Sequence, residues 1–289
     1  MYVKKISIIT LAYNNCHLLG KAIDSVASQK LGVDFDVEYI ILDDGSEFFD
    51  RDYVNEKLKK FSFSTRVIVN ESNIGTVRAF NRAIEESIGD LIIPLSADDE
   101  FYDNFVLKKI VNEFRVSDDL VITGLRVPMI SSKEQSELPL KKDRYLFENT
   151  NSMLRHMIFR SSIISGASTY YHREAFKKFG LFDERYRLLE DLPFIFKVLM
   201  ANQKIKLMDK KVIKYGTEGV SSNKMVNPLL KNDFNLCYSD LLNYPLGVFS
   251  KRYVRYQRTM DNDQKNKLKN IIVYPEQYLI FNFKKIINR

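Results

Sequence analysis

The sequence predicts an α/β fold in which a mostly parallel sheet is flanked by helices and followed by a helical, basic C-terminal appendage. Three observations carry this prediction. Short β-branched runs alternate with segments of helical periodicity, which is the pattern of βαβ units. Polar residues follow directly after the predicted strands. The excess positive charge of the chain is confined to its C-terminal part.

The predicted strands are continuous apolar runs, as expected for strands buried on both faces of a sheet. They lie at 6–12, 37–42, 66–70, 91–95 and 120–127, with an apolar run at 163–171 and short strands at 205–208 and 212–215. Apolar residues at helical spacing predict helices at 18–27, 75–87, 105–114, 173–179 and 192–200. The polar stretch 131–150 predicts a flexible loop or lid. Beyond Lys224 the pattern is helical, with breaks near Pro245 and Pro275.

Composition excludes several classes of protein. The two cysteines, Cys16 and Cys237, lie far apart and only three histidines are present, which argues against a disulfide framework, a zinc site or a His-rich metal site. The apolar run at the N-terminus is too short for a signal peptide, and no run approaches the ~20 apolar residues of a membrane-spanning helix. A cytoplasmic protein is therefore expected.

Charge divides the chain into two parts. Residues 224–289 contain 12 Lys/Arg and 5 Asp/Glu, whereas residues 1–223 contain 32 of each. We therefore expect a main domain over 1–223 and a helical basic extension over 224–289. The extension either packs on the main domain or on a second copy in an oligomer, or it contacts an anionic membrane surface on the inner face of the cell membrane. The neutral main domain argues against a nucleic acid partner.

The polar residues after the strands predict a ligand site. They are Tyr13 and Asn14, Asp43 to Ser46, Asn70 to Asn73, and Ser96 to Asp99. In open α/β sheets, ligands bind in the crevice at the carboxyl ends of the strands. We expect these four segments to converge there.

Asp98 and Asp99 are adjacent carboxylates, which repel each other unless a positive charge binds between them. Mn²⁺ or Mg²⁺ prefers carboxylate oxygen and, when held by one or two carboxylates, leaves coordination sites for phosphate oxygens. The alternative is a solvated loop that caps the following helix.

Two further acidic pairs have two interpretations each. Asp43 and Asp44 form a turn signal, or they accept a hydrogen bond from a nucleotide base beside Thr10 and Tyr13. Glu190 and Asp191 precede a helix, where they act as N-caps or supply a general base.

The order of these segments resembles the large inverting glycosyltransferase family 2, which has the Rossmann-like GT-A fold. The segments are ISIITLAYNN, IILDDGS, NIGTVRAFNRAI, LIIPLSADDEF, ISGASTYYHREAFKKFGLFDE and LLEDLPF. The resemblance covers about residues 3–222. It implies an enzyme that transfers a hexose, with inversion, from a nucleotide-sugar donor, which we expect to be UDP-linked.

The resemblance also implies roles for individual residues. Asp191 matches the catalytic base and Glu190 its neighbour, while Asp98 and Asp99 match the metal-binding end of the family's DxD motif. Gly166 to Ser168 match a segment that borders the donor sugar and acceptor. The positions implied to face the nucleotide are Thr10, Ala12, Tyr13, Asp43, Asp44, Asn73, Gly75, Arg78, Ser96, Ala97 and Asp98.

Two departures from the family pattern concern the metal. Ser96 stands where the first Asp of DxD is expected, so fewer carboxylates would hold the cation. Many members also carry a histidine in a segment after the base, but the corresponding stretch 215–221 contains none. Glu218 is the only acid in that stretch that could replace it.

The implied partners are a nucleotide-sugar donor and a saccharide acceptor, which could be lipid-diphosphate-linked, in surface or capsular polysaccharide assembly. Alternatives are transfer to a protein-linked glycan or an inactive nucleotide-sugar-binding module. A nucleotidyltransferase is disfavoured because no Gly-rich phosphate loop lies near the N-terminus.

Overall fold

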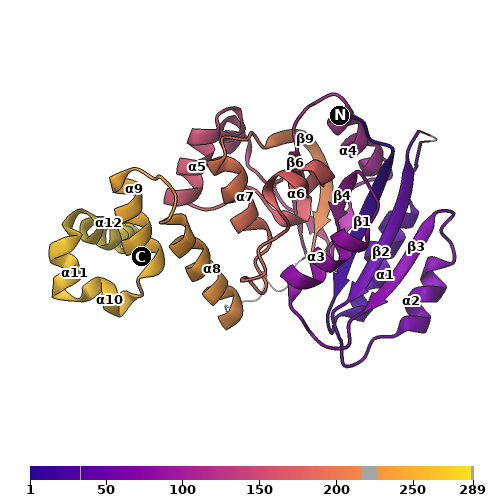
Figure 1. Ribbon diagram of the computed structural model, residues 1–289, viewed down its shortest axis with the longest axis horizontal. Helices are drawn as coiled ribbons and strands as arrows, with labels where there is room; N and C mark the ends of the chain where they lie inside the picture. Colours follow the sequence, from indigo (N-terminus) through magenta and orange to yellow (C-terminus); the bar gives the residue numbers. More distant parts are fainter. Residues whose placement is uncertain (33, 217–226, 288–289) are drawn as a thin grey trace.

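A computed structural model describes residues 1–32, 34–216 and 227–287. One mixed sheet forms the centre of the main domain (Figure 1). Its strands are ordered β3-β2-β1-β4-β8-β6-β9-β5, and β7 pairs with β6. The strands are β1 (Lys5–Ala12), β2 (Asp36–Asp43), β3 (Ser64–Val69), β4 (Leu91–Pro94), β5 (Glu100–Phe101), β6 (Val121–Ile130), β7 (Lys133–Glu134), β8 (Thr169–His172) and β9 (Lys206–Tyr215).

Strands β3, β2, β1 and β4 pair in parallel, whereas β8 runs antiparallel to both β4 and β6. The register places Ala12 beside Asp43, and Asp43 beside Val69. The carboxyl ends of the parallel strands therefore meet at one edge of the sheet, as the predicted α/β fold requires. The two short strands expected at 205–208 and 212–215 form one strand, β9, which is parallel to β6 with register shifts.

Helices cover both faces of this sheet. The α-helices are α1 (Leu19–Ala27), α2 (Arg51–Leu58), α3 (Thr76–Glu86), α4 (Val106–Arg115), α5 (Thr150–Phe159), α6 (Arg173–Phe179), α7 (Asp191–Met200), α8 (Pro228–Leu241), α9 (Val248–Tyr253), α10 (Asn262–Asn266), α11 (Leu268–Val273) and α12 (Pro275–Ile287). Shorter or irregular helices are η1 (Cys16–Leu18), η2 (Lys141–Glu148), η3 (Gly166–Ser168) and η4 (Val254–Thr259).

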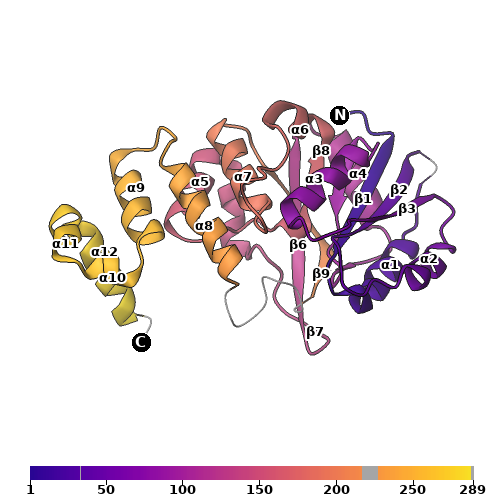
Figure 2. The ribbon, with the colours of Figure 1, turned by 60° about the horizontal axis from the view of Figure 1, so that its bottom comes forward.

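The period-2 alternation of the strands divides the core into two layers. In β1, Ile8 packs with α1, α2 and α4 on one face, whereas Ile9 packs with α3, α5, α6 and α7 on the other. In Figure 2, α1 and α2 lie on the side of β1 opposite to α3. Burial on both faces explains why the strand reads as a continuous apolar run.

The segment 131–150 is not the free loop that its polar composition predicted. It contains β7 and η2, and Leu146 and Phe147 are buried in the core. Arg144 pairs with Glu137 and Asp209. The buried apolar pair and the Arg144 ion pairs anchor the segment, and periodicity could not reveal these contacts.

The C-terminal part begins inside the core and ends outside it. Cys237 and Leu241 of α8, with Tyr253 and Val254, belong to the same apolar core as α7. Helices α9 to α12 form a lobe at the end of the molecule opposite to β3 and α2 (Figures 1 and 2). The expected breaks are confirmed, because α9 begins at Val248 and α12 at Pro275. The expected boundary at residue 223 lies outside the described residues. Within the described ranges, none of the helices is long and apolar enough to cross a bilayer.

Candidate functional site

The carboxyl edge of the sheet brings the predicted strand-end residues together. The backbone N–H of Asp44 donates to Ala12 O (2.8 Å), and that of Leu95 donates to Ile9 O (2.9 Å). The β9 end joins them, because the N–H of Gly216 donates to Asp99 Oδ1 (2.8 Å). The strand ends of β1, β2, β4 and β9 thus share one site.

Asp44 organises the segment that follows β3. Its Oδ1 accepts hydrogen bonds from Asn70 Nδ2 (2.7 Å) and Ile74 N (3.0 Å), and its Oδ2 accepts one from Gly75 N (2.9 Å). Asp43 accepts hydrogen bonds from the backbone and side chain of Ser46. The two aspartates therefore fix the loops that carry the expected nucleotide-facing residues.

Other expected nucleotide-facing residues differ in their exposure. Tyr13 is half exposed, at 49%. Thr10 is fully buried, and its hydroxyl pairs with Tyr39 (3.1 Å), so the structure does not bring it to the open edge. Arg78 pairs with Glu184 at the surface (3.5 Å).

Sequence reasoning missed Arg187, which lies against the segment 73–75. Its guanidinium donates to the carbonyl (3.1 Å) and the side-chain oxygen (2.6 Å) of Asn73. Gly75 has φ +93°, and a Cβ there would lie 2.8 Å from Arg187 Cγ. Only glycine tolerates both that conformation and that approach. The sequence signal that could have identified Arg187 is its position three residues before the expected Glu190–Asp191 pair.

Asp99 is the most strongly perturbed acid on the metal side of the site. It is fully buried, and among the described residues its Oδ2 has no hydrogen-bond partner. Burial first, and then the negative charge of Asp98, raises its pKa to about 8, although the Gly216 N–H and the Ser96 side chain oppose the shift. A buried carboxylate oxygen without a partner is costly, and a bound cation would remove that cost.

The residues present fit a divalent cation held by few protein ligands. Asp98 and Asp99 are adjacent, and a Cβ at residue 216 would lie 2.3 Å from Asp98 O and 2.8 Å from Asp98 Oδ2, so β9 closes tightly on the pair. Within the described ranges no group of three or more Asp, Glu, His or Cys is placed to hold a metal. A cation here would take its remaining ligands from water and a diphosphate, as Mg²⁺ commonly does. Glu218, the suggested substitute for the histidine, lies outside the described residues.

Asp191 occupies the first turn of α7 with both oxygens engaged. Oδ2 accepts from Gly166 N (2.8 Å) and Oδ1 from Leu192 N (2.6 Å). Glu190 occupies the N-cap position, but its side chain makes no capping hydrogen bond. The capping alternative therefore does not describe Glu190, whereas the Asp191 carboxylate is aimed at the segment 166–168 that the resemblance places beside donor and acceptor.

Burial shifts the pKa of both acids in the same direction. It raises the pKa of Glu190 to about 8, with further contributions from Asp191 and Asp233. Burial also raises the pKa of Asp191, but the N–H groups of Gly166 and Leu192 and the charge of Arg126 oppose it. The two carboxyl groups therefore titrate as a pair, and the two N–H donors and Arg126 favour the ionised form of Asp191.

These raised pKa values predict a pH dependence of stability. In the unfolded chain the ordinary pKa values are 3.8 for Asp99 and 4.5 for Glu190, so between about pH 4 and pH 8 the folded protein binds more protons. The free energy of unfolding contributed by these groups therefore falls as pH rises through that window. Carboxylates with lowered pKa values, such as Asp183, act below it.

We expect the melting temperature of the protein in chelator to fall between pH 5 and pH 8. Asp99→Asn should flatten this slope, because an amide has no proton to lose, and should raise the melting temperature at pH 8. Thermal denaturation of both proteins across that range measures the difference. Parallel curves for the native protein and the variant would contradict the assignment.

A carboxylate from the C-terminal part holds the segment that leads to Glu190. Asp233 of α8 is buried, and its Oδ2 accepts from the backbone N–H of Arg187 (3.0 Å), Leu188 (2.6 Å) and Leu189 (3.1 Å). Three N–H donors on one oxygen fix the approach to α7. Sequence patterns gave no signal for this contact, because α8 reads as an ordinary helix.

Asp233→Ala should lower the free energy of unfolding by about 2–4 kcal/mol, because three buried N–H groups lose a charged acceptor. Asp263→Ala is the matched control, since this exposed acid lies in the same part of the chain. Urea denaturation of both variants gives the comparison. Equal stability of the two would show that the contact contributes nothing.

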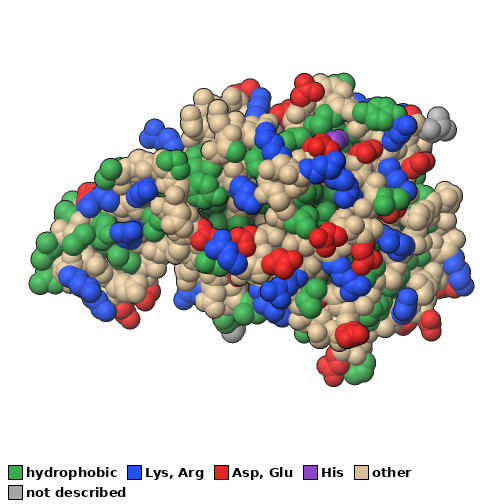
Figure 3. Space-filling view, viewed as in Figure 1, with side chains coloured by type: hydrophobic (Ala, Val, Ile, Leu, Met, Phe, Trp, Pro, Cys, Tyr) green, Lys and Arg blue, Asp and Glu red, His purple; other side chains and the backbone are tan. Residues whose placement is uncertain are grey.

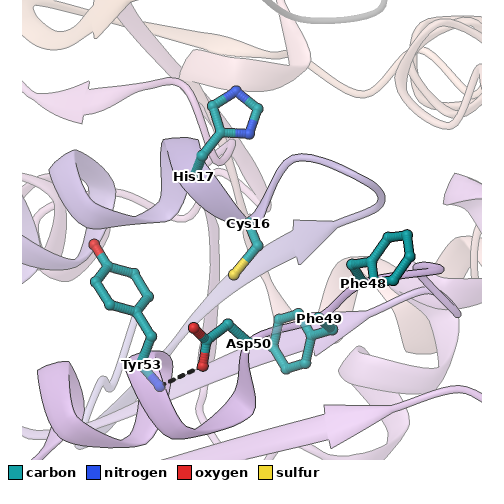
Figure 4. A pocket seen from close by; sticks show the side chains of 6 residues that line it. All are labelled: Cys16, His17, Phe48, Phe49, Asp50 and Tyr53. Carbon is teal, nitrogen blue, oxygen red and sulfur yellow. Dashed lines mark hydrogen bonds between the residues drawn. The ribbon is translucent and has the colours of Figure 1, made fainter.

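A separate hollow of about 530 Å³ lies between the start of α1 and α2. It is lined by Cys16, His17, Phe48, Phe49, Asp50 and Tyr53. In Figure 4 the Cys16 thiol points toward Asp50, and Asp50 accepts from the backbone N–H of Tyr53 (2.8 Å). None of the expected site residues lines this hollow, but it adjoins the loops after β1 and β2, where the Asn14 N–H donates to Ser46 Oγ (2.7 Å).

Comparisons with known proteins agree with this geometry. The sequence model described as "Glycosyl transferase family 2" matches residues 7–180. An uncharacterized glycosyltransferase of Rickettsia typhi is 29% identical over 205 residues, which cover 70% of this chain and 60% of that protein. The chain thus spans less than two thirds of this relative's length.

Two solved structures share the GT-A fold. One is S. aureus TarS 1–349 in complex with UDP-GlcNAc, with TM-score 0.66, 19% identity, and coverage of 94% of this chain and 79% of that one. The other is a mannosyltransferase from Pyrobaculum calidifontis in complex with GDP-Man and Mn²⁺, with TM-score 0.64, 13% identity, and coverage of 95% and 73%. Because the family match extends over more than half of the chain and includes both acidic strand ends, the chain belongs to glycosyl transferase family 2.

Proposed function

We propose that the protein transfers a hexose from a UDP-linked sugar to a saccharide hydroxyl with inversion, in surface or capsular polysaccharide assembly. One observation supports the proposal: the segments that hold two acids, Asp99 and Asp191, both contact Arg126. Asp99 is held by Gly216 with one carboxylate oxygen unpartnered among the described residues, and Asp191 is held by Gly166. A metal-side acid and a base-side acid are what this reaction requires.

Asp191 takes the proton of the acceptor hydroxyl as that oxygen attacks the anomeric carbon. Attack comes from the face opposite the diphosphate, so a single displacement forms the new C–O bond, breaks the bond to the diphosphate and inverts the configuration. The N–H groups of Gly166 and Leu192 keep Asp191 oriented, and burial raises the pKa of Glu190 beside it. Holding both sugars in line supplies much of the rate.

Asp98 and Asp99 would hold Mn²⁺ or Mg²⁺, which when bound stabilises negative charge on the departing nucleoside diphosphate. Because Ser96 stands in place of an acid, Asp98 and Asp99 are the carboxylates of this motif that remain to hold the cation. The loop fixed by Asp44 carries Asn73 and Gly75 to the nucleotide, with Tyr13 at the base and Arg78 toward the phosphates. Support for a nucleotide sugar and a metal comes from neighbours of the same fold solved with UDP-GlcNAc, and with GDP-Man and Mn²⁺.

A thermal-shift panel of nucleotide sugars with Mn²⁺ tests the proposal, since a ligand that binds the folded state raises its melting temperature. UDP-sugars should give the largest shifts, and the donor found should be consumed when saccharide acceptors are added. Binding without turnover on any acceptor would instead identify an inactive nucleotide-sugar-binding module. Turnover only on a protein-linked glycan would replace the polysaccharide role.

We further propose that the C-terminal lobe rests on the anionic inner face of the cell membrane, beside a lipid-diphosphate-linked acceptor. Apolar side chains at helical spacing are left exposed on α11 and α12, namely Leu268, Ile272, Leu279, Phe283 and Ile286. Most acids of this part are engaged within the protein: Asp233 and Asp240 hold the main domain, and Glu276 pairs with Arg252. Hydrophobic and basic side chains gather at this end of the molecule (Figure 3). Exposed apolar side chains in a part of the chain with excess positive charge suit an anionic bilayer.

The double variant Leu279→Asn, Phe283→Asn should lose co-sedimentation with anionic vesicles that the native protein shows, and neither should pellet with neutral vesicles. Val116→Asn is the control, because Val116 is also exposed but lies at the end of α4 in the main domain. A truncation at residue 223 is a poor test, since it removes core residues Cys237 and Leu241. If the double variant instead converts a dimer to a monomer and still pellets with anionic vesicles, the lobe is a dimer interface.

A further inference from the structure

Arg126 of β6 lies between the two segments that hold the acids. Its Nη1 donates to Ser165 Oγ (2.6 Å), and its guanidinium stacks over the Tyr215 ring at 4.8 Å from the centroid. Ser165 precedes Gly166, which donates to Asp191, and Tyr215 precedes Gly216, which donates to Asp99. One cation therefore touches the segment that positions the base-side acid and the segment that positions the metal-side acid.

The Arg126 backbone is fixed as firmly as its side chain. Its N–H donates to Leu138 O (3.0 Å), and its carbonyl accepts from Leu138 N (2.8 Å). The side chain is half-buried, and its charge acts on both Asp99 and Asp191. A charge held in this way keeps its position when a ligand enters, and that is the condition for strong electrostatic stabilisation.

The negative groups of the proposed reaction require positive charge in addition to the divalent ion. The loaded site would contain the carboxylates of Asp98, Asp99 and Asp191 together with a diphosphate, and a single divalent ion does not balance them. In-line displacement places the diphosphate between the Asp98–Asp99 side and the anomeric carbon, with Asp191 beyond that carbon. Arg126 spans the same interval, and guanidinium is the side chain best suited to bind phosphate oxygens through several N–H groups.

We propose that Arg126 binds the diphosphate of the nucleotide sugar and stabilises its charge as it departs. This inference rests on the proposed function. It assigns to β6 a phosphate contact that the nucleotide-facing segments of β1, β2 and β4 do not supply. Arg126 would also compensate for the missing acid at Ser96. Its positive charge is held by the protein itself and does not depend on a further carboxylate ligand.

The alternative is a purely structural role, in which Arg126 only ties Ser165 to Tyr215. The two roles differ in what they do to ligands with and without phosphate. A phosphate contact affects UDP and leaves uridine unaffected, whereas a loosened site weakens both. Arg126→Gln removes the charge but keeps an N–H donor for Ser165, and Arg126→Lys keeps the charge but loses the planar fork.

Binding of UDP and of uridine to each protein is measured by calorimetry and NMR titration in the presence of Mg²⁺. Arg126→Gln should weaken UDP by about 10- to 100-fold, the usual effect of removing a charge-assisted hydrogen bond, and leave uridine within about 2-fold. Arg126→Lys should fall between native and Gln. Arg115→Gln is the control, because Arg115 bonds the Val3 and Asp34 carbonyls at the opposite edge of the sheet.

An equal loss of UDP and uridine affinity, or no loss of UDP affinity, would overturn the role of Arg126 alone. If Arg126→Gln fails to fold, Arg126→Lys decides the question. Full retention of UDP affinity in the Lys variant would contradict a phosphate contact by the guanidinium. An equal loss of UDP and uridine affinity would contradict it as well. A native protein that binds neither UDP nor any other nucleoside diphosphate would overturn the proposed function, and this inference with it.

Discussion

Asp191→Asn is expected to lower the turnover number of sugar transfer by about 10²- to 10⁴-fold, the usual contribution of a general base. The amide still has one oxygen to accept a hydrogen bond, but it cannot take the acceptor's proton. Because Asp191 contacts Gly166 and Leu192 rather than the strand ends that face the nucleotide, UDP affinity should be unchanged. Steady-state kinetics with donor and acceptor, combined with UDP calorimetry, measure the two quantities.

Two companion variants sharpen this prediction. Glu190→Gln should cost far less turnover than Asp191→Asn, because burial already favours the protonated form of Glu190. Glu174→Gln, which changes a first-turn acid of α6 that pairs with Lys177 at the surface, should leave turnover unchanged. An Asp191→Asn protein with near-normal turnover would remove Asp191 from the role of base.

Withdrawal of the metal is expected to have the second large effect. Excess EDTA should lower transfer by roughly 10²-fold or more, because charge on the departing diphosphate loses its counter-ion, and Mn²⁺ or Mg²⁺ should restore it. Asp99→Asn should show the same low activity at every metal concentration, since the buried oxygen that fits a cation is then absent or neutral. Activity across a metal titration gives both results.

The response of the melting temperature to Mn²⁺ provides a second test of the metal site. In the native protein Mn²⁺ should raise the melting temperature, and in Asp99→Asn that rise should be lost although the variant remains folded. Asp103→Asn changes an acid of the same region that pairs with Lys109, so it should keep the response to Mn²⁺. Undiminished transfer by the native protein in chelator would refute the metal assignment.

Much of the fold could be predicted because its signals are local. The run at 6–12 is β1, and the apolar spacing at 192–200 is α7 with its N-terminus one residue earlier. Helix α2 was missed because its surface is mostly polar, with only Val54 and Leu58 buried. Helix α5 was missed because it begins at the end of the segment 131–150, whose mostly polar composition predicted a loop.

Less of the site could be predicted, because its contacts cross long stretches of chain. Motifs similar to those of glycosyl transferase family 2 predicted Asp98, Asp99, Glu190 and Asp191 as site residues, and these roles stay predictions. They gave no signal for Asp233, which lies 44 to 46 residues from the N–H groups that it holds. They also placed Thr10 at the nucleotide, whereas its hydroxyl faces Tyr39 within the core.

The amino-acid sequence by itself determined that strands alternate with helices and that acids follow the strands, because periodicity and turn chemistry act over a few residues. It also determined the charge of the C-terminal part. Only the tertiary structure decided what each acid faces. Gly216 reaches Asp99 across 117 residues, and Arg126 meets both anchoring segments only because β6 lies between β8 and β9. Desolvation and charge depend on these neighbours, so the environments that distinguish Asp99, Glu190 and Asp191 exist only in the folded chain.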